Sequence, residues 1–376
     1  MPAGVYLHIP FCKSRCSYCD FATDVYRDSG AVDRYVNALV REIGLFTDIP
    51  PATETIIDTI YFGGGTPSLL EPGQVEIILT AVWEKFRVLT GAEVTMEMNP
   101  ATVSAEKLAA YRELGVNRAS FGVQTFNDRD LKLLARGHDA NDARETFRLL
   151  RDAGFANISF DLIAGLPGQE MDDWRNNLAE ALAMRPEHLS LYLLEVHQGT
   201  PLAEQLRAGR RPMPDEDAAA EMYETMLEMT AASGYTQYEI SNFSLPGFES
   251  RHNTKYWRLD PVFGFGVSAH SFDGTRRYSN DRDTAGYVKR IEEEGSAEVG
   301  RESIDLESEF IFLGLRLNEG IQLAGYKERF GEEITEKYAA ELDRLTELGL
   351  VDVSAERIAL TRRGMLFSNE VFAEFV

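Results

Sequence analysis

Residues 6–19 read YLHIPFCKSRCSYC, and this stretch decides the fold of the 376-residue chain. A short apolar run is followed by three cysteines with the spacing C-x3-C-x2-C, and the chain has no other cysteine. An odd number of cysteines within so few residues cannot form a disulfide framework. The stretch therefore indicates a metal centre in a reducing compartment, and we expect a cytoplasmic protein.

The three thiolates of Cys12, Cys16 and Cys19 match the donor set of an iron–sulfur cluster. A [4Fe-4S] cluster takes one thiolate on each iron, so a loop with three cysteines leaves the fourth iron open to another ligand. Zinc is the alternative, because His8 could complete a tetrahedral site with the three cysteines. The spacing is not that of a usual zinc finger, and it favours the cluster.

The composition excludes several classes of partner. Lys and Arg total 38 against 61 Asp and Glu, and the formal net charge is -23. Such a field repels phosphate backbones, so we expect no nucleic acid partner. No apolar run approaches the roughly 20 residues that cross a bilayer, so we expect no transmembrane segment.

Short apolar runs alternate with amphipathic stretches through the first half of the chain. The predicted strands are residues 5–9, 57–62, 93–98, 119–123, 158–163 and 189–194, and the predicted helices are residues 34–46, 72–86, 105–114, 141–153 and 170–184. Asp33 and Ser104 are predicted N-caps, and Gly115 and Gly154 follow predicted C-termini. This alternation predicts an α/β fold with parallel strands and crossover helices. Periodicity alone does not distinguish an open sheet from a partial barrel.

The chain length predicts more than one domain, since single cores stop growing near roughly 250 to 300 residues. We expect the alternating unit to occupy residues 1–205. Residues 206–300 are predicted to extend or cap it, with a helix at 216–233 and a Gly- and aromatic-rich stretch at 235–278. Residues 301–376 are predicted to form a small winged-helix-like domain, with helices at 306–317 and 332–348, strands around Val351 and Ile358, and a last helix from Arg362.

Polar residues and glycines follow the predicted strands where each strand ends. They are the run Gly63-Gly64-Gly65-Thr66-Pro67, then Glu97, Gln124 and Asp161. In a barrel of parallel strands that end carries the chemistry. The alternatives are a tight turn for the glycines and internal hydrogen bonds or ion pairs for the polar groups.

These motifs together resemble those of radical S-adenosylmethionine (SAM) proteins of the oxygen-independent coproporphyrinogen III oxidase type, over essentially the whole chain. The resemblance implies a partial (β/α)6 TIM-like barrel with a mainly helical, winged-helix-like C-terminal domain. It also implies a [4Fe-4S] cluster on the three cysteines, SAM on its open iron, and an electron donor if SAM is cleaved. The positions that match SAM contacts are Tyr6, Tyr18, Gly64, Gly65, Thr66, Glu97, Gln124, Arg136 and Asp161.

Two features separate the branches of this family. The oxidases carry a further cysteine two positions after the third, where this chain has Phe21. They also carry an N-terminal segment ahead of the first strand, and we expect that segment to be absent here because the first predicted strand begins by Val5. The other branch, the haem chaperones, carries an H-N-x-x-Y-W motif linked to haem binding. Residues 252–257 match it completely, so the resemblance implies haem contacts at His252, Asn253, Tyr256 and Trp257.

The sequence therefore favours a haem chaperone that passes haem to an acceptor protein, without coproporphyrinogen oxidase activity. The alternatives are the radical SAM oxidase itself and another radical SAM enzyme acting on a tetrapyrrole, and no catalytic residue is assigned. The hexapeptide alone would favour a loop packed on the barrel over a haem site, and Phe21 together with the short N-terminal segment reverses that preference. The run Gly264-Phe265-Gly266-Val267-Ser268-Ala269 superficially fits a dinucleotide fingerprint, but no helix is predicted after it, which excludes NAD binding there.

Overall fold

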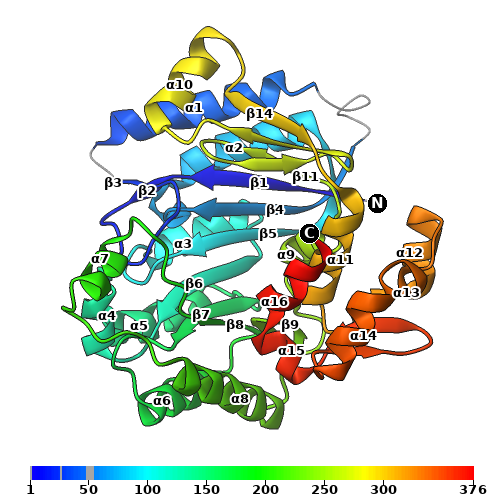
Figure 1. The fold of residues 1–376 in the computed structure, drawn as a ribbon. Helices are drawn as coiled ribbons and strands as arrows, with labels where there is room; N and C mark the ends of the chain where they lie inside the picture. Colours follow the sequence, from blue (N-terminus) through cyan, green and yellow to red (C-terminus); the bar gives the residue numbers. More distant parts are fainter. Residues whose placement is uncertain (1, 26–27, 48–54) are drawn as a thin grey trace.

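The computed structural model describes residues 2–25, 28–47 and 55–376. Its centre is a large sheet in which six neighbouring strands, joined by helices, run parallel and curve into a partial barrel (Figure 1). These strands are β1 (Ala3–Ile9), β4 (Ile56–Gly64), β5 (Arg87–Met98), β6 (Arg118–Gln124), β7 (Ile158–Ala164) and β8 (His188–Leu193). All six predicted strands are confirmed. Only β5 differs clearly, because it begins at Arg87 and extends the predicted strand toward its N-terminus.

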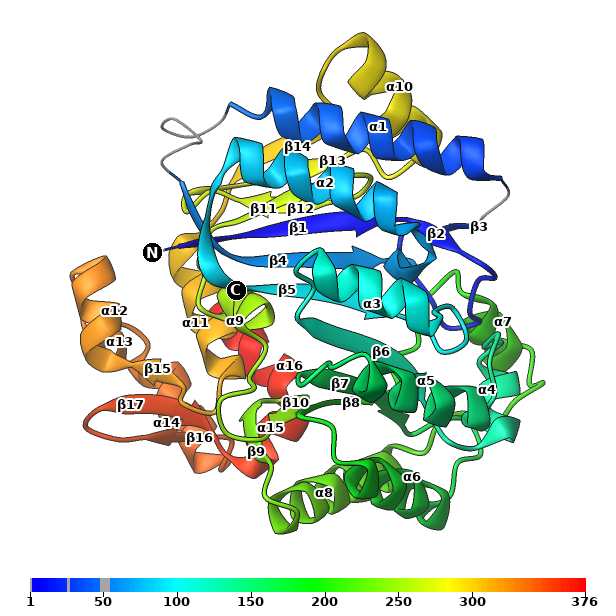
Figure 2. The same cartoon turned by 180° about the vertical axis from the view of Figure 1, so that it is seen from behind.

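Helices α1 (Ser29–Leu45), α2 (Pro72–Lys85), α3 (Ala105–Glu113), α4 (Asp128–Leu133), α5 (Ala140–Asp152) and α6 (Met171–Met184) connect these strands, and α7 (Pro201–Arg207) and α8 (Glu216–Ala232) follow β8. Most of them cover the outer face of the barrel, whereas α4 and α7 lie at the carboxyl ends of the strands (Figure 2). Ser104 caps α3 as predicted. The prediction for Asp33 is wrong: Asp28 caps α1 by accepting from the Ala31 N–H, while Asp33 lies inside the helix and accepts from Gln74.

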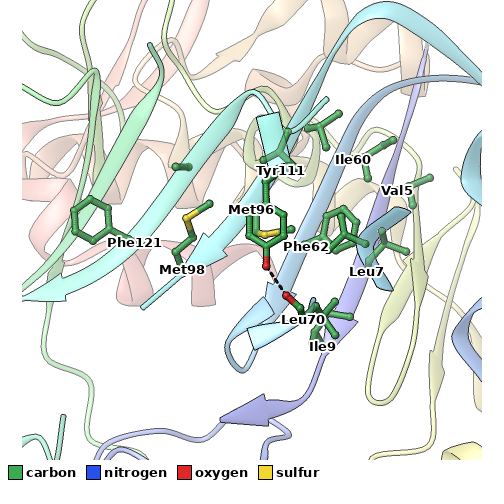
Figure 3. Close-up of a cluster of buried hydrophobic side chains, with 14 of the residues drawn as sticks. Val5, Leu7, Ile9, Ile60, Phe62, Leu70, Met96, Met98, Tyr111 and Phe121 are labelled. Carbon is green, nitrogen blue, oxygen red and sulfur yellow. Dashed lines mark hydrogen bonds between the residues drawn. The ribbon is translucent and has the colours of Figure 1, made fainter. Parts of the chain in front are cut away.

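The core lies between the strands and this helical layer (Figure 3). Alternate residues of β1, among them Val5 and Leu7, are fully buried on the outer face and belong to the same cluster as Phe62 of β4. The Tyr111 hydroxyl of α3 donates to the Leu70 carbonyl at 2.6 Å, so this hydroxyl in the apolar layer has a hydrogen-bond partner. The opposite face of each strand points into the barrel, where the polar residues gather.

The sheet continues beyond β1 and beyond β8. β11 (Val262–Phe265) pairs parallel with β1 and is followed outward by β12 (His270–Phe272), β13 (Arg276–Asn280) and β14 (Glu298–Ser303). On the other side β10 (Asn242–Ser244) pairs antiparallel with β8 and is followed by β9 (Thr236–Glu239). α10 (Thr284–Glu293) packs on α1, and α9 (Arg251–Trp257) lies against β1 and β4. Residues after 232 therefore lengthen the barrel wall at both edges.

The C-terminal unit has its own small sheet in the order β15-β17-β16 and its own core. Its elements are α11 (Leu306–Arg316), β15 (Ile321–Gln322), α12 (Leu323–Phe330), α13 (Ile334–Lys337), α14 (Ala339–Glu347), β16 (Val351–Val353), β17 (Arg357–Leu360), α15 (Arg362–Leu366) and α16 (Ser368–Phe372). The predicted helix over 332–348 is wrong as one element, because Tyr338 leaves helical geometry and its ring packs against Phe375. This unit is winged-helix-like, as expected. Within the described ranges, no helix has the length and apolar character needed to span a membrane.

Candidate functional site

The cysteine loop lies at the carboxyl end of β1. Cys12 ends the short strand β2 (Phe11–Cys12), which pairs with β3 (Asp24–Val25). Between Cys16 and Cys19, Ser17 is buried and fixes the loop to α4, because its N–H donates to the Leu134 carbonyl at 2.9 Å. All three cysteines are unpaired and partly exposed. The loop is therefore held by its backbone while the thiols remain accessible.

The surroundings of the thiols suit a cluster. Burial raises the pKa of the Cys12 thiol to about 11 and also raises the pKa of Cys19, so the thiolates need the charge of a bound metal. Thr66 Oγ1 donates to Cys12 Sγ at 3.6 Å, and Arg136 Nη1 lies 3.5 Å from Cys16 Sγ. Such hydrogen bonds to sulfur are among the features that tune cluster potentials.

A single metal ion fits this arrangement less well. Among the residues that the structure describes, no three His, Cys, Asp or Glu side chains gather around one ion. A cubane cluster places each thiolate on a different iron, so the three sulfurs need not converge on one point. His8 is buried, with Nδ1 3.1 Å from the Tyr6 hydroxyl and Nε2 2.9 Å from the Ala22 carbonyl. Both ring nitrogens of the candidate fourth zinc ligand are therefore engaged.

Asn99 connects the cysteine loop to the neighbouring strands, and sequence reasoning missed it. Arg136 Nη2 donates to Asn99 Oδ1 and to the Gly122 carbonyl, both at 2.7 Å. Asn99 Nδ2 in turn donates to Thr66 Oγ1 at 2.8 Å. The signal was present, since Asn99 follows the same strand end as Glu97. Arg136 also lies 3.5 Å from the Tyr18 hydroxyl, so the structure brings these predicted residues together.

The glycine run of β4 packs directly on the cysteine loop. Gly65 N–H donates to the Ile9 carbonyl and Thr66 N–H to the Phe11 carbonyl, both at 2.8 Å. A Cβ at Gly65 would lie 2.7 Å from the Pro10 carbonyl oxygen, which is closer than real Cβ atoms approach. Gly64 has a φ of 110°, in the region that favours glycine. The glycines therefore allow two backbones to lie against each other beside the cysteines.

Glu97 points into the barrel beside this run. Its carboxylate accepts from the Tyr61 hydroxyl at 2.8 Å and from the Gly64 N–H at 3.0 Å. Burial raises its pKa to about 7, against the lowering effect of these bonds. Tyr6 stacks on Tyr61 with ring centroids 6.1 Å apart. A carboxylate whose pKa is raised because it lies in a buried place without a cationic partner gains from a polar or cationic ligand group.

Gln124 and Asp161 lie on the neighbouring strands β6 and β7 of the barrel. Gln124 has a φ of 66°, which is uncommon for a residue other than glycine and marks a strained strand end. Its side chain occupies the space beside Gly122, where a Cβ would lie 2.4 Å from Gln124 Nε2. Burial raises the pKa of Asp161 to about 6, and a Ser190 hydrogen bond and the charges of Arg118 and Arg136 oppose this.

The H-N-x-x-Y-W motif lies at the other end of the barrel. Residues 252–257 belong to α9, which covers the amino ends of β1 and β4, whereas β2 and the cysteine loop lie at their carboxyl ends (Figure 2). His252 is 1% exposed, and its Nδ1 lies 2.9 Å from Thr59 Oγ1 and its Nε2 3.2 Å from the Tyr256 hydroxyl. Burial lowers its pKa to about 3. The structure does not bring the motif and the cysteine loop together.

The other motif residues have different surroundings. Trp257 packs with the cluster of Leu259, Phe272 and Leu313, and the Arg316 guanidinium lies 4.4 Å from its ring centre. Asn253 is half-buried and its backbone N–H donates to Ser250 Oγ. Tyr256 is 37% exposed although its hydroxyl contacts His252. Haem contacts for these residues stay a prediction, and in this conformation His252 has no free ring nitrogen.

Comparison with known proteins agrees with this geometry. The model of the radical SAM superfamily matches residues 6–181, and the model of the HemN C-terminal domain matches residues 303–367. A solved structure, coproporphyrinogen III oxidase (HemN) from Escherichia coli, superposes with a TM-score of 0.86 at 25% identity and covers 100% of this chain and 90% of that one. The fold and the cysteine loop thus define a radical SAM protein.

The similarity to curated sequences is more specific. Heme chaperone HemW of Bacillus subtilis (strain 168) is 37% identical over 99% of this chain and 99% of its own length. Heme chaperone HemW of Escherichia coli (strain K12) is 32% identical over 100% of this chain and 98% of its own. The chain belongs to the HemW family of radical SAM proteins.

Proposed function

We propose that this protein is a cytoplasmic haem chaperone that binds a [4Fe-4S] cluster and SAM, takes up haem and transfers it to an acceptor protein. The observation that carries the proposal is the full-length similarity to proteins named as haem chaperones. Phe21 supports it, since it stands where the oxidase branch has a further cysteine, and its side chain is 67% exposed beside the cysteine loop. Three unpaired thiols suit a reducing compartment.

The residues at the carboxyl ends of the parallel strands have distinct proposed roles. Cys12, Cys16 and Cys19 hold the cluster, and Thr66 and Arg136 donate hydrogen bonds to two of the sulfurs. When bound, the cluster and SAM supply one-electron reductive cleavage of SAM, which needs an electron donor. The SAM contacts are assigned to Tyr6, Tyr18, Gly64, Gly65, Thr66, Glu97, Gln124, Arg136 and Asp161. Glu97 and Asp161 supply buried carboxylates on the inner wall, and the glycine run allows a close backbone approach.

The second candidate is the oxidative decarboxylation of coproporphyrinogen III to protoporphyrinogen IX. The structural agreement with coproporphyrinogen III oxidase favours it, because the whole chain superposes on that enzyme. Proteins that share a fold can have different functions, so the superposition does not decide between chaperone and oxidase. The two functions must be distinguished by what the site binds and converts.

The test is haem titration of the anaerobically reconstituted protein, followed by Soret absorption, beside an assay with coproporphyrinogen III, SAM and a reductant. The chaperone function predicts stoichiometric haem binding, transfer to apo-acceptor, and no protoporphyrinogen IX. Formation of protoporphyrinogen IX at an enzymatic rate would replace the proposal with the oxidase function. Absence of haem binding would refute the chaperone function directly.

A further inference from the structure

The amide of Asn99 lies in the middle of a chain of hydrogen bonds that ends on two of the three cysteine sulfurs. On one side, Asn99 Oδ1 accepts from Arg136 Nη2 at 2.7 Å, and Arg136 Nη1 lies 3.5 Å from Cys16 Sγ. On the other side, Asn99 Nδ2 donates to Thr66 Oγ1 at 2.8 Å, and Thr66 Oγ1 donates to Cys12 Sγ at 3.6 Å. One uncharged side chain therefore joins the hydrogen-bond donors of two sulfurs.

The direction of each bond in this chain follows from the donors and acceptors available. A guanidinium can only donate, so the atom of Asn99 that faces Arg136 is the carbonyl oxygen, and the amide nitrogen faces Thr66. Thr66 then accepts from this nitrogen, which leaves its single hydroxyl proton to donate to Cys12 Sγ. The amide thus points the Thr66 proton at sulfur.

Asn99 also orients the guanidinium of Arg136. Nη2 of this group donates to Asn99 Oδ1 and to the Gly122 carbonyl, both at 2.7 Å. Because the guanidinium is planar and its donors have a fixed geometry, two acceptors on Nη2 determine the direction of Nη1. Nη1 is the atom that lies 3.5 Å from Cys16 Sγ. The acceptor supplied by Asn99 therefore helps to direct a positively charged group at a second sulfur.

The backbone holds Asn99 in this place. Its carbonyl accepts from the Thr102 N–H at 3.2 Å and from the Thr102 hydroxyl at 2.6 Å, in the turn that follows β5. The same turn contacts the cysteine loop directly, because Lys13 Nζ donates to the Ala101 carbonyl at 3.3 Å. Side chains whose support is fixed by such hydrogen bonds keep their orientation toward a metal site.

We propose that Asn99 is a positioning residue for the iron–sulfur cluster and raises its reduction potential. Its amide directs the Thr66 hydroxyl and the Arg136 guanidinium at sulfurs of the cluster ligands. Hydrogen bonds to these sulfurs stabilise the more negative, reduced cluster, so the loss of either donor lowers the potential. The inference rests on the cluster-binding part of the proposed function and is independent of haem.

Asn99→Asp is the sharpest test, because it replaces the donor of the amide by an acceptor. A carboxylate can only accept, so the Thr66 hydroxyl turns its proton from sulfur to the new oxygen, while Arg136 keeps its partner. Asn117→Asp is the matched control. Asn117 is also half-buried, and its amide bonds on both sides, to the Val94 N–H and the Ala92 carbonyl. It directly precedes β6, at the amino end of that strand.

The measurement is the midpoint potential of the reconstituted cluster without SAM, from an anaerobic redox titration followed by electron paramagnetic resonance. We expect Asn99→Asp to shift the reduction equilibrium at least tenfold toward the oxidised cluster, which is about 59 mV for a one-electron couple. Asn99→Ala, which adds no charge, should shift it in the same direction, and Asn117→Asp should keep the wild-type potential. Circular dichroism shows that each variant is folded, and iron and sulfide content shows that it holds the cluster.

Thr66→Val separates the hydroxyl from the added charge. Without the hydroxyl there is no proton to turn, so the shift caused by Asn99→Asp should be smaller in the Thr66→Val background, as for any pair of interacting groups. Equal shifts in the two backgrounds would mean that charge alone is responsible and would overturn the role of Thr66.

The remaining outcomes also decide the inference. A wild-type potential in both Asn99 variants, or an equal shift in Asn117→Asp, would overturn it while leaving cluster binding in place. Loss of the cluster from both Asn99 variants would make Asn99 a structural residue of the loop and would equally overturn it. A wild type that takes up no cluster would overturn the inference together with the cluster-binding part of the proposed function.

Discussion

His252→Ala tests whether the imidazole of the H-N-x-x-Y-W motif is a structural part of the barrel floor, the layer that α9 forms across the amino ends of β1 and β4. The substitution removes a side chain that is 1% exposed and bonded to Thr59 and Tyr256. It leaves the hydroxyl of Thr59, which is 0% exposed, without its partner, at a cost of about 1–3 kcal/mol. It also opens a cavity beside Tyr61, whose ring stacks on His252 with centroids 5.0 Å apart. The part of this cavity that remains after the surroundings relax costs a further 1–2 kcal/mol, roughly.

We therefore expect His252→Ala to lower the free energy of unfolding by about 3 kcal/mol. Urea unfolding, followed by circular dichroism under anaerobic conditions, measures this difference. His270→Ala is the matched control, since its ring is exposed, and should change stability by less than about 0.5 kcal/mol. A loss below about 1 kcal/mol for His252→Ala would show that the imidazole does not support the floor. Haem binding is then compared only at temperatures where both variants are folded.

Three further predictions concern the floor and the cysteine loop. The folded-state pKa of His252, about 3, lies below its ordinary value of 6.5, so the unfolded chain takes up the proton first as pH falls. The stability contributed by His252 is complete above pH 6.5 and should fall by about 2 kcal/mol between pH 7 and pH 5. The stability difference between wild type and His252→Ala, measured by urea unfolding at both pH values, should narrow by that amount, and an unchanged difference would contradict the burial argument. Gly65→Ala should reduce cluster incorporation at least severalfold, because its Cβ would meet the Pro10 carbonyl, whereas Gly73→Ala, with open space around it, should reconstitute normally; equal iron and sulfide content in both would refute the packing argument. Arg136→Gln should weaken SAM binding in equilibrium dialysis by about tenfold or more, since a charged hydrogen bond contributes about 1.5–3 kcal/mol, and wild-type affinity would count against its role.

Local patterns predicted the elements of this fold well. Each of the six parallel strands is a short apolar run, and its outward residues are buried as their alternation requires. The N-cap of α1 was misassigned because several acidic residues lie near that helix start, and only the backbone geometry selects Asp28. The break at Tyr338 was missed for a similar reason, since the segment has helical periodicity and the contact with Phe375 is distant in sequence.

The cysteine spacing and the strand-end residues also predicted the neighbourhood of the candidate site. Parallel strands end at one edge of a sheet, so Thr66, Glu97, Gln124 and Asp161 had to approach the loop after β1. Asn99 carries the same signal and was overlooked. Nothing local indicated that it would bridge Thr66 to Arg136.

Tertiary structure decided what the sequence left open. The sequence by itself determined the thiol donor set, the parallel α/β architecture and the family resemblance, because these depend on spacing and periodicity within short segments. Only the fold decided that His252 faces a buried threonine at the amino ends of β1 and β4 and that Asn99 bridges Thr66 to Arg136. Both outcomes depend on which strands become neighbours. That pairing joins residues far apart in the chain, and a local pattern does not encode it.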